Sequence, residues 1–295
     1  MAAASSSAGV GTSATELDAL KALTFQRLHP KTYLERFLAE NVRPDGREFD
    51  EWRDISVNVG SISTADGSAL VRLGSTTIIC GVKAEIAEPE LDKPKEGFLV
   101  PNLDLPAICS PKFKPGPPTD EAQVLSDRLN DVLISSGVVS PASLCIEPGK
   151  AAWVLYVDAT CINYDGNAFD ATLLAMVAAL KNTRLPKARF DEDRQQTICS
   201  RKTREPLALG RLPTSFSFGI FDGTHVLADS TSFEEPLLDT SVSVVIDDEG
   251  GLVSVMQLGL GVVGGGKGDV LTTCIHAARE CWAKTRKDVY GPRGP

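Results

Sequence analysis

Histidine is scarce in this chain, and its cysteines are not spaced to bind metal. There are three histidines, far apart in the sequence, and the seven cysteines form no C-x-x-C pair. Zinc sites place Cys and His ligands at short, regular spacings, so we expect no metal, and nothing in the sequence indicates another cofactor. An odd number of cysteines, several of them in apolar runs, is typical of free thiols in a reducing compartment, the cytosol or the nucleus.

Long apolar runs and an excess of positive charge are also missing. The longest nearly apolar run, residues 171–180, has ten residues, about half of what crosses a bilayer, so no membrane partner is expected. The first fifteen residues are mostly Ala, Ser, Gly and Thr, which predicts a disordered tail rather than a signal peptide. The net charge of −9 argues against a free-standing nucleic-acid binder. It leaves open a subunit that adds a few basic loops to a shared channel.

The apolar pattern predicts two successive groups of strands, each followed by a helix. Helical spacing between residues 17 and 38 predicts two short helices, and strands are expected at 55–59, 69–73 and 76–83. Residues 88–118 hold eight of the eighteen prolines, which predicts a long loop with room for one short edge strand. Thr119 is placed to cap a helix, and residues 151–164 and 169–181 read as a strand and a buried helix.

The second half repeats this order after a polar stretch. Strands are expected at 214–221, 225–228, 242–246 and 252–258, with an Asp-Gly turn at 222–223, and the final helix at 269–288. Strands followed by a packed helix, twice over, indicate an α+β fold. We assign residues 1–28 to a disordered or helical N-terminal extension. The first half is 29–185, a connecting segment is 186–211, the second half is 212–288, and a tail is 289–295.

The glycine-rich run at 259–268 imitates nucleotide-binding motifs. Gly259, Gly261 and Gly264 satisfy G-x-G-x-x-G, but only about thirty residues follow, too few for a dinucleotide-binding unit. The run also approaches a Walker A motif, except that Gly268 stands where Ser or Thr should hold magnesium. A flexible turn that leads into the last helix is the favoured interpretation.

Several ordered motifs resemble the RNase PH family of phosphate-dependent exoribonucleases, in particular its branch in the eukaryotic exosome ring. They are Arg-Pro-Asp-Gly-Arg at 43–47, Ser-Ile-Ser-Thr-Ala-Asp-Gly-Ser-Ala-Leu-Val at 61–71, Cys-Gly-Val-Lys-Ala-Glu at 80–85, Pro-Asn-Leu-Asp-Leu-Pro at 101–106, Gly-Pro-Pro at 116–118 and Pro-Gly-Lys-Ala-Ala-Trp-Val-Leu-Tyr at 148–156. The resemblance spans roughly residues 31–288. It implies the RNase PH-like fold, which is similar to ribosomal protein S5 domain 2.

The resemblance also implies where RNA and phosphate would bind, and these positions carry the wrong charges. Active members place an arginine pair just before the first long helix, where this chain has Asp120 and Glu121. They follow the central strand with Gly-Ser-Arg, where this chain has Gly166, Asn167 and Ala168. The guanidinium fork that suits a phosphate oxyanion is therefore missing from the matching loop.

The acidic positions are altered as well. Active members use one aspartate to protonate the leaving oxygen and another, six residues on, to hold a metal ion. Here Asp222 and Asp229 are seven residues apart, so that Gly223 falls at the acid position if Asp229 takes the metal position. If Asp222 takes the acid role instead, the register shifts by one residue. Asp222 also reads simply as a hairpin-turn residue.

These departures predict a catalytically degenerate subunit of the exosome core ring. The resemblance implies other RNase PH-like ring subunits, S1/KH cap subunits, a hydrolytic exoribonuclease and RNA as partners, in the nucleus, nucleolus and cytoplasm. Lys112 and Lys114 in the proline-rich loop are candidate RNA contacts, with solvated loop lysines as the alternative. An active phosphate-dependent exoribonuclease completed by a partner chain, and a stand-alone S5-like scaffold, remain alternatives.

Overall fold

Two short helices open the part of the chain that the structure describes. This computed structural model describes residues 14–259 and 270–290. The chain divides after Phe49 into two units, residues 1–49 and 50–295. In the first unit, α1 (Ala14–Leu28) and α2 (Pro30–Ala39) confirm the two predicted helices. Pro30 starts α2, where its missing N–H costs no hydrogen bond.

The second unit is built on a large mixed sheet. It runs in the order β1 (Ile55–Val59), β2 (Gly67–Leu73), β3 (Thr76–Ala87), β6 (Ala151–Asn163) and β4 (Phe98–Asp104), while β5 (Cys145–Glu147) pairs with β6. β4 confirms the edge strand expected in the proline-rich loop, and it pairs with β6 in parallel. The other strand pairs of this sheet are antiparallel.

A smaller antiparallel sheet follows. Its order is β10 (His225–Ala228), β9 (Thr214–Phe221), β11 (Thr240–Ile246) and β12 (Leu252–Gly259). Asp222 and Gly223 form the predicted turn between β9 and β10, both with positive φ (50° and 67°). Gly223 supplies this conformation without strain because it has no Cβ.

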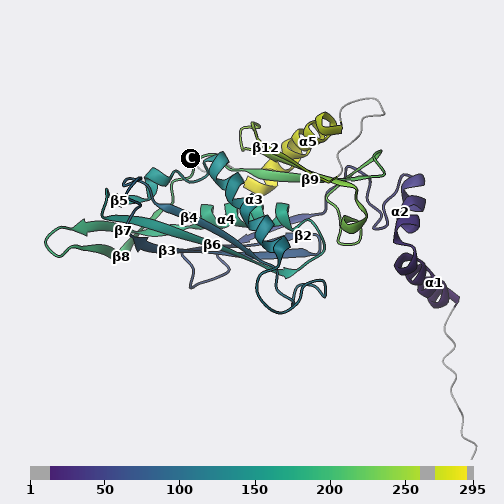
Figure 1. Ribbon diagram of the computed structural model, residues 1–295, viewed down its shortest axis with the longest axis horizontal. Coiled ribbons are helices and arrows are strands. Elements are labelled where there is room, and N and C mark those ends of the chain that lie inside the picture. Colours follow the sequence, from purple (N-terminus) through teal and green to yellow (C-terminus); the bar gives the residue numbers. More distant parts are fainter. Residues whose placement is uncertain (1–13, 260–269, 291–295) are drawn as a thin grey trace, which may run out of the picture. The chain divides into compact units, whose positions relative to one another are not determined.

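The long helices lie against these sheets (Figure 1). α4 (Ala168–Asn182) packs between the large sheet and β9, so nearly all of its side chains are buried, as its sequence predicted. α3 (Asp120–Ser136) begins after Thr119, whose side chain accepts a hydrogen bond from Ala122 N at 3.3 Å. α5 (Val270–Tyr290) covers the smaller sheet through β11 and β9. None of the described helices is both long and apolar enough to cross a membrane.

One predicted connection has more structure than the sequence indicated. Residues 186–211, assigned to a connecting segment, contain most of a two-stranded sheet of β7 (Arg184–Asp191) and β8 (Gln196–Pro206). The division of the chain into two halves stays a prediction. Residues 260–268, assigned to a flexible turn, lie outside the described residues, as do most of the predicted N-terminal tail and residues 291–295.

Candidate functional site

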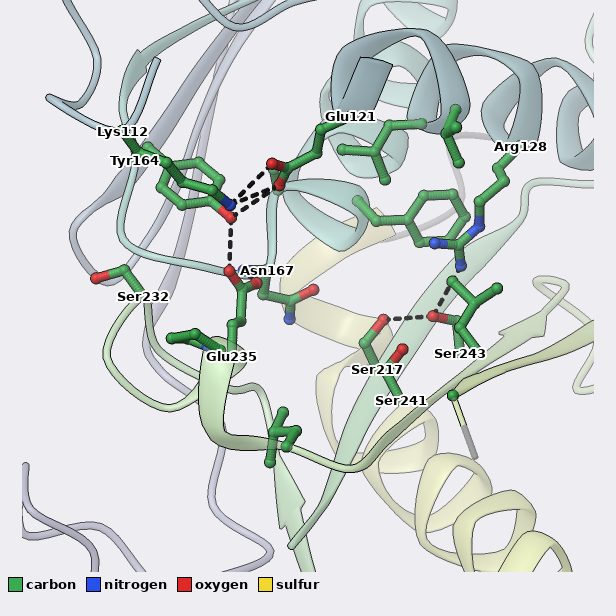
Figure 2. A pocket seen from close by; sticks show the side chains of 18 of the residues that line it. Lys112, Glu121, Arg128, Tyr164, Asn167, Ser217, Ser232, Glu235, Ser241 and Ser243 are labelled. Carbon is green, nitrogen blue, oxygen red and sulfur yellow. Dashed lines mark hydrogen bonds and ion pairs between the residues drawn. The ribbon is translucent and has the colours of Figure 1, made fainter. Parts of the chain in front are cut away.

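A cavity of about 1080 Å³ opens between α3, the start of α4 and the smaller sheet. Its wall combines side chains from the loop before α3, from β9, β11 and β12, and from the short 3₁₀ turn Glu235–Leu237. Figure 2 shows two groups of polar side chains in it, one around Tyr164 and the other around Arg128.

The group around Tyr164 is acidic. The Tyr164 hydroxyl donates to Glu235 Oε2 at 2.5 Å and lies 3.4 Å from Glu121 Oε1. Lys112 Nζ forms an ion pair with Glu121 at 2.8 Å and lies 5.1 Å from the centre of the Tyr164 ring. Burial raises the pKa of Glu235 above its ordinary value, and the hydrogen bond from Tyr164 offsets only part of this effect. The pKa of Tyr164 is also raised, first by burial and then by the charge of Glu235.

Asn167 turns its donors toward carboxylates. It has a positive φ of 52°, a conformation that Asn tolerates better than most residues, and it starts α4. Its backbone N–H donates to Glu235 Oε1 at 2.7 Å. Its side-chain amide donates to Asp229 Oδ1 at 2.7 Å and to Asp170 Oδ2 at 2.9 Å. Both amide hydrogens are therefore used inside the protein, which leaves none to bind an anion in the cavity.

Asp229 is sealed inside the fold by Arg53. The Arg53 fork donates from Nε to Asp229 Oδ2 and from Nη2 to Oδ1, both at 2.7 Å, and the Arg53 backbone N–H adds a third bond at 3.1 Å. Asp229 has no exposed surface. Burial alone would raise its pKa, but the hydrogen bonds and charge of Arg53 lower it below the ordinary value. This carboxylate is ionised, paired and structural.

The group around Arg128 is basic. The guanidinium lies over the Phe169 ring, 4.3 Å from its centre, and Nη2 donates to Ser243 Oγ at 3.0 Å. Ser243 Oγ is 3.0 Å from Ser217 Oγ, which in turn donates to Asp170 Oδ1 at 2.8 Å. The two ends of the cavity thus differ in the sign of their charge.

Two stretches of the chain match known protein families. Residues 51–186 match the 3′ exoribonuclease family, domain 1, and residues 211–281 match domain 2 of the same family, RNase PH. The chain belongs to the RNase PH family.

Individual relatives of this RNase PH family member are exosome proteins. It is 46% identical to exosome complex component rrp43 of Schizosaccharomyces pombe, over 80% of this chain and 87% of that protein. It is 39% identical to exosome complex component Rrp42 of Methanopyrus kandleri, over 74% of this chain and 81% of that protein. A chain of the Archaeoglobus fulgidus exosome with RNA bound to the active site superposes with a TM-score of 0.76 at 30% identity, covering 88% of this chain and 96% of that one. The RNase PH-like α+β fold expected from the sequence is confirmed.

In this RNase PH family member, the cavity gathers five of the eight residues singled out from the sequence. These five are Lys112, Asp120, Glu121, Asn167 and Ala168. The other three do not line it: Lys114 is exposed, Gly223 lies in the β9–β10 turn, and Asp229 pairs with Arg53. No three His, Cys, Asp or Glu side chains within residues 14–259 and 270–290 form a group that could hold a metal ion.

Glu235, Ser241 and Arg128 are among the cavity residues that sequence reasoning missed. Glu235 and Ser241 are six residues apart, the spacing that the family resemblance attaches to its two acids, and both line the cavity. If these are the matching positions, a carboxyl is retained at the first and replaced by a hydroxyl at the second. That spacing was the signal that could have found them. Arg128 lies in the helix predicted after Thr119, but a single arginine on a helix carries no motif that would assign it a role.

Proposed function

We propose that this chain is a non-catalytic subunit of the exosome core ring, which supports 3′-to-5′ RNA processing and decay, including rRNA maturation and mRNA turnover. Its similarity to exosome components of a fungus and of archaea supports this assignment. In this proposal its partners are other RNase PH-like ring subunits, S1/KH cap subunits, a separate hydrolytic exoribonuclease and RNA. The complex works in the nucleus, the nucleolus and the cytoplasm.

The observation that carries the loss of catalysis is the charge at the Tyr164 end of the cavity. Glu121 and Glu235 face the tyrosine hydroxyl, and Lys112, which lines the same cavity, is already paired with Glu121. At an effective dielectric constant of about 20, an RNA phosphate held about 4 Å from one of these carboxylates is repelled by roughly 4 kcal/mol. Asn167 cannot compensate because Asp229 and Asp170 occupy its amide. The Tyr164 end of the cavity therefore does not hold RNA and inorganic phosphate, which are both negatively charged, next to each other.

One observation favours the alternative, an active phosphate-dependent exoribonuclease. Glu235 is a half-buried carboxyl whose pKa is raised, a property expected of a general acid. Arg128 supplies a cation in the same cavity. A partner chain that covers the cavity could then complete an unusual site.

The two functions are separated by an assay of the purified chain, alone and within the ring, with 3′-labelled RNA and inorganic phosphate. The non-catalytic proposal expects no labelled nucleoside diphosphate from this subunit. The active enzyme would be established instead if the wild type releases labelled product and Glu235→Gln does not. The control is Asp229→Asn, compared at an equal amount of folded protein, which should still release product. Native mass spectrometry of the tagged assembly tests ring membership separately. A stand-alone scaffold would purify without ring subunits.

A further inference from the structure

Arg128 is held in place before any ligand arrives. Phe169 supports one face of its guanidinium, and Ser243 accepts from Nη2. Ser243 is itself fixed through Ser217, which Asp170 anchors by accepting from both the backbone N–H and the hydroxyl at 2.8 Å. Figure 2 shows the Arg128 guanidinium pointing toward Ser243, with the Lys112–Tyr164–Glu121 group on the other side of the view. Binding of a partner would therefore cost little additional side-chain entropy of Arg128.

This arginine forms no direct ion pair in the described part of the chain. No carboxylate lies within ion-pair distance of Arg128 there, and its buried Nε has no hydrogen-bond partner among the described residues. Asp170 attracts it electrostatically, but the Asp170 oxygens already accept from Ser217 and Asn167. A desolvated guanidinium with an unused donor costs free energy that an incoming anion would recover.

We propose that the Arg128 end of the cavity is an interface site that takes a carboxylate side chain from a neighbouring protein of the ring. This inference rests on the proposed function, because it needs such a neighbour. Arg forms paired hydrogen bonds with carboxylates and is enriched among the residues that dominate protein interfaces.

The total charge of the cavity favours a carboxylate on a protein segment over a free phosphate. Among the described residues, four acids, Asp120, Glu121, Glu235 and Asp239, line it beside two cations, Lys112 and Arg128. A phosphate carrying close to two negative charges would enlarge this negative excess. A protein segment brings one negative charge to Arg128 and can place a basic or neutral donor beside the acidic end. Complementary charges of this kind fix the register of an interface.

Apolar side chains beside the site also suit a protein partner. Val124 is 53% exposed and Leu258 is 44% exposed, and both line the same cavity as Arg128. Large exposed apolar side chains grouped around a desolvated charge are typical of an interface that excludes water from its central contacts. RNA would instead require cations around the rim.

The first test measures how firmly the chain is held in the assembled ring. Arg128→Met keeps the apolar stem over Phe169 and removes the charge. Arg279→Met on α5 is the matched control, since Arg279 is an exposed helical arginine outside the cavity. We expect Arg128→Met to weaken binding to the adjoining subunit by roughly 30-fold or more, and Arg279→Met by less than about threefold. Equal retention of the two variants would overturn the proposal.

The second test identifies the carboxylate. Arg128→Lys places a primary amine at the site, and a carbodiimide couples an amine to a carboxylate in contact with it, forming an amide bond as the reagent takes up the elements of water. Mass spectrometry of the treated ring should find position 128 linked to an Asp or Glu of another subunit. A link only to a carboxylate of this same chain, or none, would overturn the proposal.

Titration of the isolated chain with inorganic phosphate tests the remaining alternative, that the Arg128 end of the cavity binds a free oxyanion. Binding of inorganic phosphate that is lost in Arg128→Met and kept in Arg279→Met would show an oxyanion site and overturn the interface assignment. No such binding supports it. If the wild-type chain fails to co-purify with ring subunits, the proposed function fails as well. If it co-purifies and only the Arg128 tests fail, the ring assignment stands without this inference.

Discussion

Removing Arg53 should destabilise the fold far more than removing an exposed arginine. In Arg53→Met, the Asp229 carboxylate loses the two guanidinium hydrogen bonds and its counter-charge while it stays buried. It keeps the hydrogen bonds from the backbone N–H of residue 53 and from the Asn167 amide. Breaking a buried pair by deleting one partner costs about 3–5 kcal/mol. For a chain of this size, that loss corresponds to a fall in melting temperature of roughly 6–20 °C.

Chemical or thermal unfolding followed by circular dichroism measures this difference. The matched control is Arg204→Met, which removes an ion pair to Asp66 of 3.2 Å whose arginine is 53% exposed, and should cost less than about 1 kcal/mol. Adding Asp229→Asn to Arg53→Met should recover part of the loss, because the uncompensated charge disappears. The reasoning is refuted if Arg53→Met costs no more than Arg204→Met.

The same pair predicts a dependence on pH with a defined sign. The pKa of Asp229 is lowered in the folded state, so the pair stabilises the fold at pH values above the ordinary Asp value of 3.8. The contribution is lost as pH falls through the lowered pKa. The stability difference between the wild type and Arg53→Met should therefore be largest near neutral pH. It should shrink as pH falls, starting above pH 3.8, because the buried carboxylate without Arg53 takes up a proton at a higher pH than an ordinary Asp.

Three further changes have expected outcomes. Because burial raises the pKa of Glu235, its ionised form weakens the fold as pH rises above the ordinary value of 4.5; Glu235→Gln should melt higher than the wild type at pH 8, with the difference disappearing toward pH 4.5. Lys114→Ala should lower the salt dependence of RNA binding by the assembled ring, by about 0.7 in the slope of log affinity against log salt concentration. Lys112→Ala should lower this slope by less, because Lys112 is already paired with Glu121. Equal slopes for the two variants would contradict this. Gly67→Ala should cost about 1–3 kcal/mol on unfolding, since a Cβ would lie 2.6 Å from the Ala179 carbonyl oxygen, whereas Gly223→Ala meets no atom within 4 Å and pays only for its positive φ.

Most of the secondary structure could be predicted from the sequence because burial leaves a periodic pattern. The helix after Thr119 and the buried helix α4 follow from a cap and from apolar spacing, and the structure confirms both. The hairpin of β7 and β8 leaves no such pattern. Leu185 is buried in β7, but its other positions are exposed or partly buried, and four of its eight residues are charged. Its strands pair with each other and cover little of the core, so polarity alone suggested a connection.

The site was harder to predict because its contacts join distant residues. The family resemblance identified the positions of Glu121 and Asn167, but the bond between Tyr164 and Glu235 links residues 71 positions apart. Glu234 and Glu235 are adjacent in one turn and look equivalent in the sequence. In the structure, Glu234 accepts from Thr231 within the turn, whereas Glu235 enters the cavity. Only the fold distinguishes them.

The placement of α4 between two sheets sets the order in which a nascent chain can be protected. Its face toward the large sheet can be covered as soon as it leaves the ribosome, because β2, β3 and β6 all precede it. The opposite face waits for β9, which ends at Phe221, 39 residues after Asn182. At roughly 5–20 residues per second, translation leaves this apolar surface bare for about 2–8 s. During that interval, the growing chain avoids aggregation with other proteins through binding of a chaperone or through rapid completion of the fold.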